Sequence, residues 1–329
     1  MAFKVLVADK MEQEGLDQLA QIADEVQFDA SLKDDTLKAR LAEFDPDVLV
    51  VRSTKVPAEI QAAGKSLRLI VRAGSGYDTI DTAAAAERGI RVCNCPGMNA
   101  VAVAELVMGL IIALDRKIAD NVIDLRAGRW RKKVYAKVGR GLKGHTLGVI
   151  GAGRIGAAVA RRALAFEMNV VWYDVVPEAD LGGLAGAEGV ARAELDDVLR
   201  RADFVTLHVP GGEGTRHLID AKRLALMKKE AVLINTSRAG VVDEAALIAA
   251  IDAGKLRGAG LDVYADEPPA DAETIESPVC RVDGIYGTHH IGASTEQAQR
   301  AVAAEAVRIV ARFKETGEAL HCVNLPAGA

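Results

Sequence analysis

The sequence predicts an α/β protein built on parallel sheets, and three observations lead to that prediction. Short apolar runs of β type alternate with helical segments along most of the chain, which is the pattern of βαβ units. A glycine-rich turn at residues 151–156 (GAGRIG) separates one such run from a helix. At 329 residues the chain also exceeds the size that one hydrophobic core usually serves, so we expect two domains.

The predicted strands fall into two groups. In the first third of the chain they cover residues 3–8, 48–52, 67–72 and 90–93. Further along they cover residues 147–150, 170–173, 204–208, 232–235 and 260–263, and residues 284–291 can add another. Apolar residues spaced near 3.6 predict long helices over about 100–126 and 295–314.

Composition restricts the classes of function. The net charge of −5 argues against nucleic acid as a partner, because nucleic-acid binding depends on neutralising phosphates. No apolar run reaches the roughly 18 residues of a membrane span. The N-terminus has a strand pattern and lacks the layout of a signal peptide, so we expect a cytoplasmic protein without membrane contact.

The cysteines indicate neither a disulfide framework nor a metal site. There are four of them, Cys93, Cys95, Cys280 and Cys322, and they are widely scattered. Cys93 and Cys95 share a face if they lie in a strand, but no second Cys/His pair has the spacing of metal ligands. We therefore expect buried thiols that behave as small apolar side chains, and no metal.

The glycine turn predicts a dinucleotide site. Gly151 allows a tight turn, Gly153 lets the backbone approach a pyrophosphate, and Gly156 lets the helix pack on the strand. The helix N-terminus then offers N–H groups to the phosphates. Asp174 follows the next strand about 20 residues on, where a carboxylate accepts the ribose hydroxyls. Because that carboxylate repels the extra phosphate of NADP, we predict NAD as the cofactor.

The position of this turn in mid-chain predicts a discontinuous organisation. A dinucleotide-binding domain would occupy residues 100–290. Residues 1–99 and 291–329 would together form a second domain that binds substrate. The chain would cross twice between the domains through its two long helices, which would make suitable hinges beside an interdomain ligand cleft.

Three polar residues follow predicted strands of the second group. A dehydrogenase that oxidises a hydroxy acid needs a base, a partner that orients the base, and a cation that holds the carboxylate. His290, Glu267 and Arg238 supply these three types, each just after a strand. Ligands of doubly wound sheets bind beyond the carboxyl ends of the strands, so the three can converge on one small-molecule substrate.

These segments together resemble the D-2-hydroxyacid dehydrogenase family, and within it most closely the D-3-phosphoglycerate dehydrogenases in a short form without a regulatory domain. The resemblance runs from about residue 48 to the C-terminus. It is carried by the glycine turn, the Arg238 segment and residues 51–56 (VRSTKV), 72–78 (RAGSGYD), 207–210 (LHVP), 242–244 (VDE), 261–263 (LDV) and 290–295 (HIGAST). It implies a Rossmann NAD-binding domain inserted into a flavodoxin-like substrate domain.

The resemblance also implies roles for individual residues. Arg238 would hold the substrate carboxylate and carbonyl oxygen, His290 would be the general acid/base, and Glu267 would orient His290 and favour its imidazolium form. The implied cofactor-binding residues are Gly151, Gly153, Arg154, Ile155, Gly156, Asp174, His208, Val209, Pro210, Thr236, Ser237, Asp262 and Gly292. The implied substrate-binding residues are Arg52, Ser53, Ser75, Gly76 and Asn99.

The chain departs from the family pattern at two positions near these residues. His289 stands where the family usually has proline, and we choose His290 as the acid/base because residues 291–294 (IGAS) follow it in the family's order. Ala239 stands where glycine is common, which would be unfavourable if the position needed a positive φ.

The substrate is expected to be 3-phosphoglycerate, oxidised to 3-phosphohydroxypyruvate in serine biosynthesis. A basic segment would bind its phosphate through Arg129, Arg131, Lys132, Lys133, Lys137 and Arg140. That segment could equally be a solvated loop, with Arg52 and Lys55 binding the phosphate instead. The alternatives are a glyoxylate/hydroxypyruvate reductase, a D-lactate-type enzyme and, in a different class, an NADH-sensing corepressor-like binding protein. The family is usually dimeric, and residues 101–114 with the loop near Trp130 are the expected contact, although the sequence fits residues 101–114 as internal core equally well.

Overall fold

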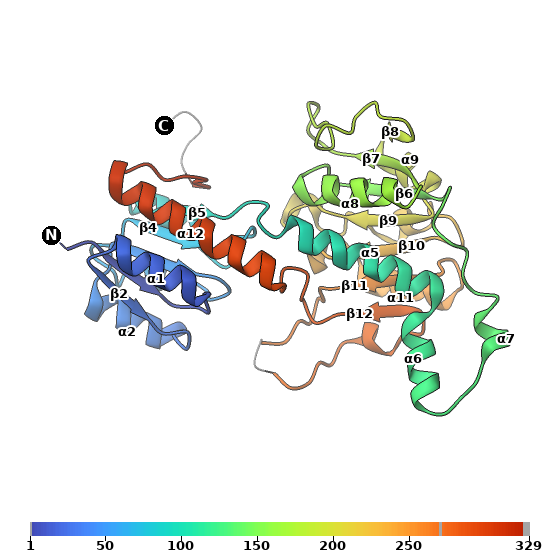
Figure 1. Ribbon diagram of the computed structural model, residues 1–329, viewed down its shortest axis with the longest axis horizontal. Coiled ribbons are helices and arrows are strands. Elements are labelled where there is room, and N and C mark those ends of the chain that lie inside the picture. The colour runs from blue at the N-terminus through green and yellow to red at the C-terminus, as the bar shows by residue number, and fades with distance from the viewer. Residues whose placement is uncertain (1, 270–271, 325–329) are drawn as a thin grey trace. The chain divides into compact units, whose positions relative to one another are not determined.

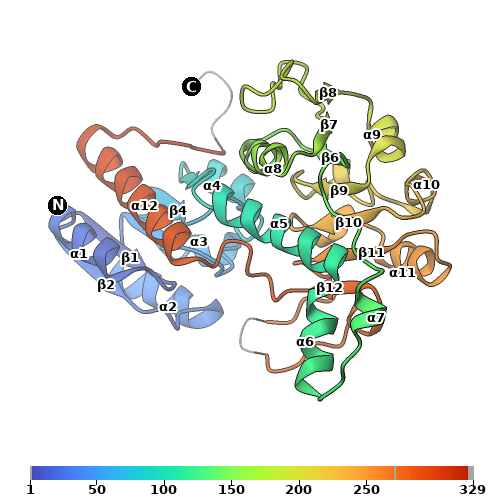
Figure 2. The same ribbon diagram turned by 45° about the vertical axis from the view of Figure 1, so that its right-hand side comes forward.

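The computed structural model describes residues 2–269 and 272–324, and these form two compact units. Unit 1 comprises Met1–Asn99 and Ser294–Ala329, and unit 2 comprises Ala100–Ala293. Figures 1 and 2 show the elements of each unit from two directions. Both units are layered, with helices on both faces of a parallel sheet.

Unit 1 is built on five parallel strands in the order β2-β1-β3-β4-β5, which is the flavodoxin-like order. The strands are β1 (Lys4–Val7), β2 (Glu25–Phe28), β3 (Val48–Val51), β4 (Leu69–Arg72) and β5 (Arg91–Asn94). The helices are α1 (Gln13–Ile22), α2 (Asp34–Phe44), α3 (Ala58–Gln61), α4 (Thr82–Glu87) and α12 (Glu296–Thr316). One apolar cluster joins the sheet to α1 and α12, and another joins its opposite face to α2, α3 and α4.

Unit 2 is built on seven parallel strands in the order β12-β11-β10-β9-β6-β7-β8. They are β6 (Thr146–Ile150), β7 (Asn169–Tyr173), β8 (Val190–Arg192), β9 (Phe204–Leu207), β10 (Val232–Asn235), β11 (Gly258–Leu261) and β12 (Ile285–Gly287). The six strands β6 to β11 have the order of the doubly wound Rossmann fold, and β12 adds a seventh strand beside β11. The α-helices are α5 (Ala100–Arg116), α6 (Ile118–Arg126), α7 (Lys132–Tyr135), α8 (Arg154–Ala165), α9 (Leu195–Arg201), α10 (Ala221–Leu224) and α11 (Glu244–Asp252).

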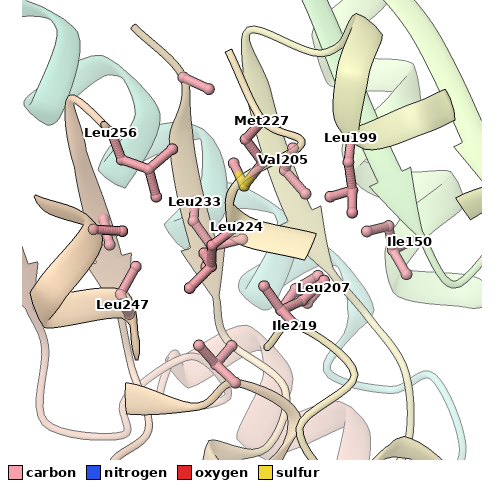
Figure 3. Packing of buried hydrophobic residues seen from close by; sticks show 14 of the residues in the cluster. Ile150, Leu199, Val205, Leu207, Ile219, Leu224, Met227, Leu233, Leu247 and Leu256 are labelled. Carbon is pink, nitrogen blue, oxygen red and sulfur yellow. The ribbon is translucent and has the colours of Figure 1, made fainter. Parts of the chain in front are cut away.

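Two apolar layers cover the sheet of unit 2. Helices α5 and α8 contribute to one layer together with Trp172 and Phe204, which are almost completely buried. Figure 3 shows the other layer, where Leu199 of α9, Leu224 of α10 and Leu247 of α11 pack against the central strands. Strands covered on both faces have no polar alternation, which explains the continuous apolar runs in the sequence.

The predicted fold class is confirmed, and three local differences have physical causes. The edge strands β2 and β8 were not predicted because they are short and mostly unburied, so neither carries an apolar run. The long helix predicted over 100–126 is two helices, because Lys117 has a φ of 51° and ends α5 before α6 begins.

Among the residues described, we find no helix with the length and apolarity to cross a membrane.

Candidate functional site

Three adjacent strands of unit 2 end beside one another and carry the three residues predicted to be catalytic. Strands β10, β11 and β12 are neighbours in the parallel sheet, so their carboxyl ends lie along one edge. Arg238 follows β10, Glu267 lies on the loop after β11, and His290 follows β12. Sequence order alone does not show that these three strands are neighbours.

The structure brings Glu267 and His290 into direct contact. Nδ1 of His290 lies 2.6 Å from Oε1 of Glu267, and the two side chains remain 51% and 38% exposed. A carboxylate at this distance fixes the orientation of the ring. The ring therefore presents its other nitrogen, Nε2, for proton exchange. His290 has a φ of 50°, an uncommon backbone conformation for a residue other than glycine.

The buried carboxylate of Asp262 holds the loop that carries His290. Its Oδ1 atom accepts hydrogen bonds from Thr288 Oγ1 at 2.6 Å and from the Ile291 N–H at 2.9 Å. Its Oδ2 atom accepts from the Gly292 N–H at 2.8 Å. Since Asp262 is only 1% exposed, these bonds fix the backbone on both sides of His290. Asp262 therefore bonds to Gly292 and to other residues of the loop that carries His290.

Two further residues of the site were missed in the sequence. The hydroxyl of Tyr264 donates to the Thr288 carbonyl at 2.7 Å, and burial raises its pKa to about 12. Oε1 of Glu244 accepts from the Ala265 N–H at 2.7 Å, and burial raises the pKa of this carboxyl. Both residues lie in or next to segments that carried the resemblance, but the pattern could not show which loops they connect.

Arg238 stands on a turn that Asn235 organises. Oδ1 of Asn235 accepts from the N–H and the hydroxyl of Ser237, and its Nδ2 donates to the Arg238 carbonyl at 3.0 Å. The Arg238 guanidinium donates to the Ser237 carbonyl at 2.9 Å. Ala239, which could have been unfavourable, begins a 3-10 helix and is not among the described residues with a positive φ.

The glycine turn has the geometry that the sequence predicts for a phosphate cradle. Gly151 has a φ of 98°, and a Cβ there would lie 2.6 Å from the His208 carbonyl oxygen. A Cβ on Gly156 would collide with the Gly151 carbonyl. Gly153 is the N-cap of α8 and has open space around its Cα, while Arg154 and Ile155 form the first turn of that helix. The helix N-terminus therefore remains approachable by a phosphate.

Asp174 lies at the end of β7 and supports the same turn. Oδ2 accepts from the Ala152 N–H at 2.7 Å, and Oδ1 accepts from the Val176 N–H at 2.8 Å. Each carboxylate oxygen has two lone pairs, so these bonds leave room for ribose hydroxyl donors. Residues 175 and 176 are both valine, and the Arg192 guanidinium donates to the carbonyl groups of Asp174 and Val176 at 3.0 and 2.9 Å.

Two buried polar atoms provide an independent test of the cofactor site. Nδ1 of His208 and Oγ1 of Thr236 have no hydrogen-bond partner within the described chain. Burial lowers the pKa of His208 to about 3, so the ring is neutral, and its Nε2 lies 2.9 Å from Thr206 Oγ1. Buried polar atoms are normally paired, so both fit a polar ligand. Val209 and Pro210 continue the His208 loop, and Ser237 adjoins Thr236.

In unit 1, the residues predicted to bind substrate lie on two loops at strand ends. After β3, the N–H groups of Arg52 and Ser53 donate to Oδ2 of Asp9 at 2.7 and 3.0 Å. Asp9 follows β1 and was also missed, because a lone aspartate after a strand gives no signal of its partner. After β4, the Ser75 hydroxyl donates to Asn99 Oδ1 at 2.8 Å.

The Ser75 loop is further held by β5. Nδ2 of Asn94 donates to the Ser75 carbonyl at 2.6 Å, and the Cys95 N–H donates to the Gly74 carbonyl at 2.9 Å. No hydrogen bond between described residues uses the N–H group of Ser75 or Gly76. Two adjacent N–H groups on a fixed loop can bind an anion.

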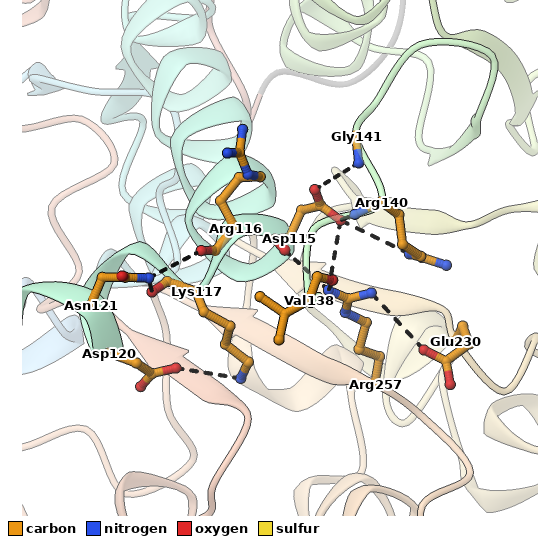
Figure 4. Close-up of polar contacts among 10 residues, drawn as sticks. All are labelled: Asp115, Arg116, Lys117, Asp120, Asn121, Val138, Arg140, Gly141, Glu230 and Arg257. Carbon is orange, nitrogen blue, oxygen red and sulfur yellow. Dashed lines mark hydrogen bonds and ion pairs between the residues drawn. The ribbon is translucent and has the colours of Figure 1, made fainter. Parts of the chain in front are cut away.

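Some cationic side chains of the basic segment already form ion pairs within unit 2. Arg129 and Arg131 pair with Asp124, and hydrogen bonds from Tyr135 and Arg129 lower the pKa of that carboxyl. Figure 4 shows the buried Asp115 accepting from the N–H groups of Arg140 and Gly141 at 3.1 and 3.0 Å. Nε of Arg140 also lies 3.9 Å from Oδ1 of Asp115, so three of the six cations form ion pairs within unit 2. Lys132, Lys133 and Lys137 are exposed.

Two of the cysteines are buried, and the described residues contain no arranged set of metal ligands. Cys93 of β5 and Cys95 just after it are both fully buried in the apolar cluster that includes α12, as predicted. Within residues 2–269 and 272–324, no group of three His, Cys, Asp or Glu side chains is arranged to hold a metal ion.

Comparison with known proteins assigns the family. Residues 108–292 match the NAD-binding domain of the D-isomer specific 2-hydroxyacid dehydrogenases. The chain belongs to this family. It is 44% identical over 318 residues to a hydroxypyruvate reductase of Thermotoga maritima, covering 96% of this chain and 99% of that protein.

Two further relatives support membership of the 2-hydroxyacid dehydrogenases. A D-3-phosphoglycerate dehydrogenase of Methanocaldococcus jannaschii is 41% identical over 327 residues, which cover 98% of this chain and 60% of that protein. The chain thus spans about 60% of the length of this relative. A solved structure from Thermus thermophilus superposes with a TM-score of 0.84 at 33% identity, covering 98% of this chain and all of that one.

Proposed function

We propose that this 2-hydroxyacid dehydrogenase is an NAD-dependent oxidoreductase that interconverts a D-2-hydroxy acid and the corresponding 2-oxo acid. The observation that carries the proposal is the 2.6 Å contact between His290 and Glu267 at the strand edge that also bears Arg238. A base, its orienting carboxylate and a cation are the groups that this reaction requires.

Each of the three residues has its own role in the proposed reaction. In the oxidative direction Nε2 of His290 accepts the hydroxyl proton of the substrate, and in the reductive direction it returns that proton to the carbonyl oxygen. Glu267 keeps the ring oriented through its contact with Nδ1. Arg238 binds the carboxylate and the carbonyl oxygen. Bound NAD supplies the chemistry of hydride acceptance and donation.

The cofactor is held by residues of unit 2 in this proposal. The residues that would hold the pyrophosphate are Gly151, Gly153 and Gly156 at the first turn of α8, beside Arg154 and Ile155. Asp174 would accept hydrogen bonds from the ribose hydroxyls. The other residues proposed to contact NAD are His208, Val209, Pro210, Thr236, Ser237, Asp262 and Gly292. The unpartnered atoms of His208 and Thr236 support this assignment.

Unit 1 is proposed to supply the substrate-binding groups. The N–H groups of Ser75 and Gly76 would bind the substrate carboxylate, and Asn99 would keep the Ser75 side chain in place. Arg52 and Ser53 would add charge and a hydroxyl from the neighbouring loop. Residues 1–99 and 291–329 would then be the substrate domain and residues 100–290 the NAD-binding domain.

The substrate we propose is 3-phosphoglycerate, which would place the protein in serine biosynthesis. The exposed cations Lys132, Lys133 and Lys137 are available for a phosphate. A second candidate is hydroxypyruvate or glyoxylate. It is favoured because the guanidinium groups of the three arginines of the basic segment already form ion pairs with Asp124 or Asp115. The relative that matches over 99% of its own length is also a hydroxypyruvate reductase.

One comparison of substrates separates these candidates. We would measure kcat/KM with NADH for 3-phosphohydroxypyruvate, hydroxypyruvate, glyoxylate and pyruvate. Preference for the phosphorylated acid, lost when Lys132, Lys133 and Lys137 are changed together to Ala, supports the first candidate. Hydroxypyruvate serves as the control on the same variant, since it lacks the phosphate. Turnover of glyoxylate or hydroxypyruvate without turnover of the phosphorylated acid would refute the first candidate.

We further propose a cytoplasmic homodimer. Most apolar side chains of residues 101–114, the expected contact, are buried in the core of unit 2. The contact we propose therefore rests on exposed apolar side chains of α6, α7 and the loop between them: Ile123, Leu125, Trp130 and Val134 are 55–79% exposed. Apolar side chains grouped in this way are typical of interfaces.

A further inference from the structure

The segment after α12 adds a short antiparallel pairing to the edge of the unit 1 sheet. Cys322 forms an isolated antiparallel bridge with Cys93 of β5. The Val323 N–H donates to the Val92 carbonyl at 2.8 Å, and the Asn94 N–H donates to the His321 carbonyl at 3.3 Å. Because the backbone bonds flank Cys93 and Cys322 on both sides, these two cysteines form a non-hydrogen-bonded pair.

That type of pair brings side chains closest together. In an antiparallel ladder the Cα atoms of a non-hydrogen-bonded pair lie about 4.5 Å apart. A disulfide needs Cα atoms about 4.4–6.8 Å apart with Cβ atoms facing each other. The pairing of Cys93 with Cys322 meets this requirement without movement of the backbone.

The side chain of Asn324 fixes the register of the pairing. Its Oδ1 atom accepts from the Val92 N–H at 2.9 Å, and its Nδ2 atom donates to the Ile90 carbonyl at 2.8 Å. These bonds tie the segment to β5 two residues beyond Cys322. A slip that would separate the two cysteines must therefore break side-chain as well as backbone hydrogen bonds.

Both cysteines are free thiols, and they differ in access to solvent. Cys93 is fully buried, whereas Cys322 is only half-buried and donates to Asn324 Oδ1 at 3.2 Å. Burial and a hydrogen bond with the Cys322 thiol raise the pKa of Cys93. Cys93 is thus protected from direct attack, and Cys322 is the thiol that an oxidant meets first.

We propose that Cys93 and Cys322 are a reversible disulfide site that closes the C-terminal segment onto β5 when the protein meets a peroxide. Hydrogen peroxide oxidises the Cys322 thiol to a sulfenic acid, and one water leaves. The sulfur of Cys93 then attacks the sulfenyl sulfur, the S–O bond breaks, and the departing oxygen takes the Cys93 proton as a second water. Two thiols are oxidised by two electrons, and one peroxide is reduced to two waters.

The other two cysteines are not suited to this reaction. Cys95 lies two residues after Cys93 on the same face of the chain. In an extended strand their Cα atoms are nearly 7 Å apart, which is too far for a disulfide between them. The described strand bridge of Cys322 is with Cys93, so Cys95 is not placed opposite it. Cys280 is exposed in unit 2 and serves as a matched control.

The test oxidises the folded full-length chain with a small excess of hydrogen peroxide and maps its disulfides by mass spectrometry. We expect a Cys93–Cys322 peptide pair, loss of two of the four thiols, and full reversal by dithiothreitol. A cross-link of this kind should raise the unfolding midpoint by roughly 5–10 °C in the oxidised form. Cys322→Ser should abolish the link and the shift, and Cys280→Ser should change neither.

Three results would overturn the proposal. The first is that all four thiols survive peroxide in the folded protein. The second is that Cys322 stops at a sulfinic acid without pairing. The third is that the recovered disulfide joins Cys280 residues of two chains. A conservative Cys93→Ser variant, whose folding is checked by its unfolding midpoint in the reduced state, should leave the Cys322 sulfenic acid trappable by dimedone.

Discussion

Nδ1 of His290 lies 2.6 Å from Oε1 of Glu267, although the two residues are 23 positions apart in the sequence. Both side chains are substantially exposed, at 51% and 38%, so this pair contributes little to stability. Its geometry is nevertheless well defined, because Asp262 and Tyr264 fix the two loops that present it. A pair of side chains that is held in a fixed geometry, although it adds little stability, is typical of a functional site.

The first prediction concerns the acid/base itself. Changing His290 to Asn should lower kcat by about 10²–10⁴-fold, because the residue that exchanges the substrate proton is lost. Binding of NADH, followed by the fluorescence of its nicotinamide, should be unchanged. The adjacent His289→Asn variant is the control and should retain near-normal turnover. Activity that survives in the His290 variant but disappears in the His289 variant would move the catalytic role by one residue.

The sequence was sufficient to predict the fold class and to place three polar residues just after strands of unit 2, and the reason is local. Strands such as Val232–Asn235 are buried on both faces and therefore read as continuous apolar runs. The glycine turn is specified by backbone constraints at Gly151 and Gly156 that only glycine meets.

The rest depends on contacts between residues distant in the sequence. Asp9 holds the Arg52 loop across 43 positions, and Tyr264 holds Thr288 across 24. Neither residue type signals its partner. The break at Lys117 was equally hidden, since lysine is a good helix former and only the local backbone, with a φ of 51°, ends α5 there.

A second prediction tests Tyr264 as a positioning residue. Tyr264→Phe deletes the hydroxyl that donates to the Thr288 carbonyl, so it should reduce the free energy of unfolding by about 1–2 kcal/mol. It should also lower kcat severalfold, because the His290 loop loses a support. Tyr286→Phe removes a comparable hydroxyl, which donates to Asp120 at 2.6 Å. That control should destabilise the protein without changing kcat, and equal effects on kcat would contradict the positioning role.

The raised pKa of Tyr264 adds a pH dependence to the same comparison. In the folded protein the pKa is about 12, above the ordinary value of 10.0, so the unfolded chain ionises first as pH rises. The stability due to this neutral hydroxyl is therefore complete below pH 10 and is lost progressively up to about 12. Denaturant unfolding from pH 9 to 11 should show a steeper loss for the unmodified protein than for Tyr264→Phe.

A third prediction concerns acid stability in unit 1. The two hydrogen bonds from Arg308 to Glu305, at 2.8 and 2.6 Å, lower the pKa of the Glu305 carboxyl below its usual 4.5. A depressed pKa contributes stability above the unfolded value and loses it as pH falls through the folded one. Glu305→Gln should thus cost about 1 kcal/mol at pH 7 and less below pH 4. Equal losses measured at pH 7 and pH 3.5 would show that the charge is unimportant.

The fourth prediction concerns cofactor choice. Asp174→Asn keeps an oxygen that can accept from the Ala152 N–H but removes the negative charge that repels a 2′-phosphate. We expect the ratio of kcat/KM for NADH over NADPH to fall by about tenfold, equivalent to about 1.4 kcal/mol. Asp180→Asn, in the loop between β7 and β8, is the control. An unaltered ratio would mean that discrimination lies elsewhere.

The last prediction tests the proposed dimer. Trp130 is 79% exposed and Ile123 is 60% exposed, and an isolated chain has no structural reason to present both to water. Changing Ile123 to Glu places a charge where the second copy would pack, so the molar mass from light scattering should fall from the dimer to the monomer. Phe28→Glu alters another exposed aromatic, on β2 of unit 1, and should leave the mass unchanged. A protein that is monomeric before any substitution, at micromolar concentration, would rule out the dimer outright.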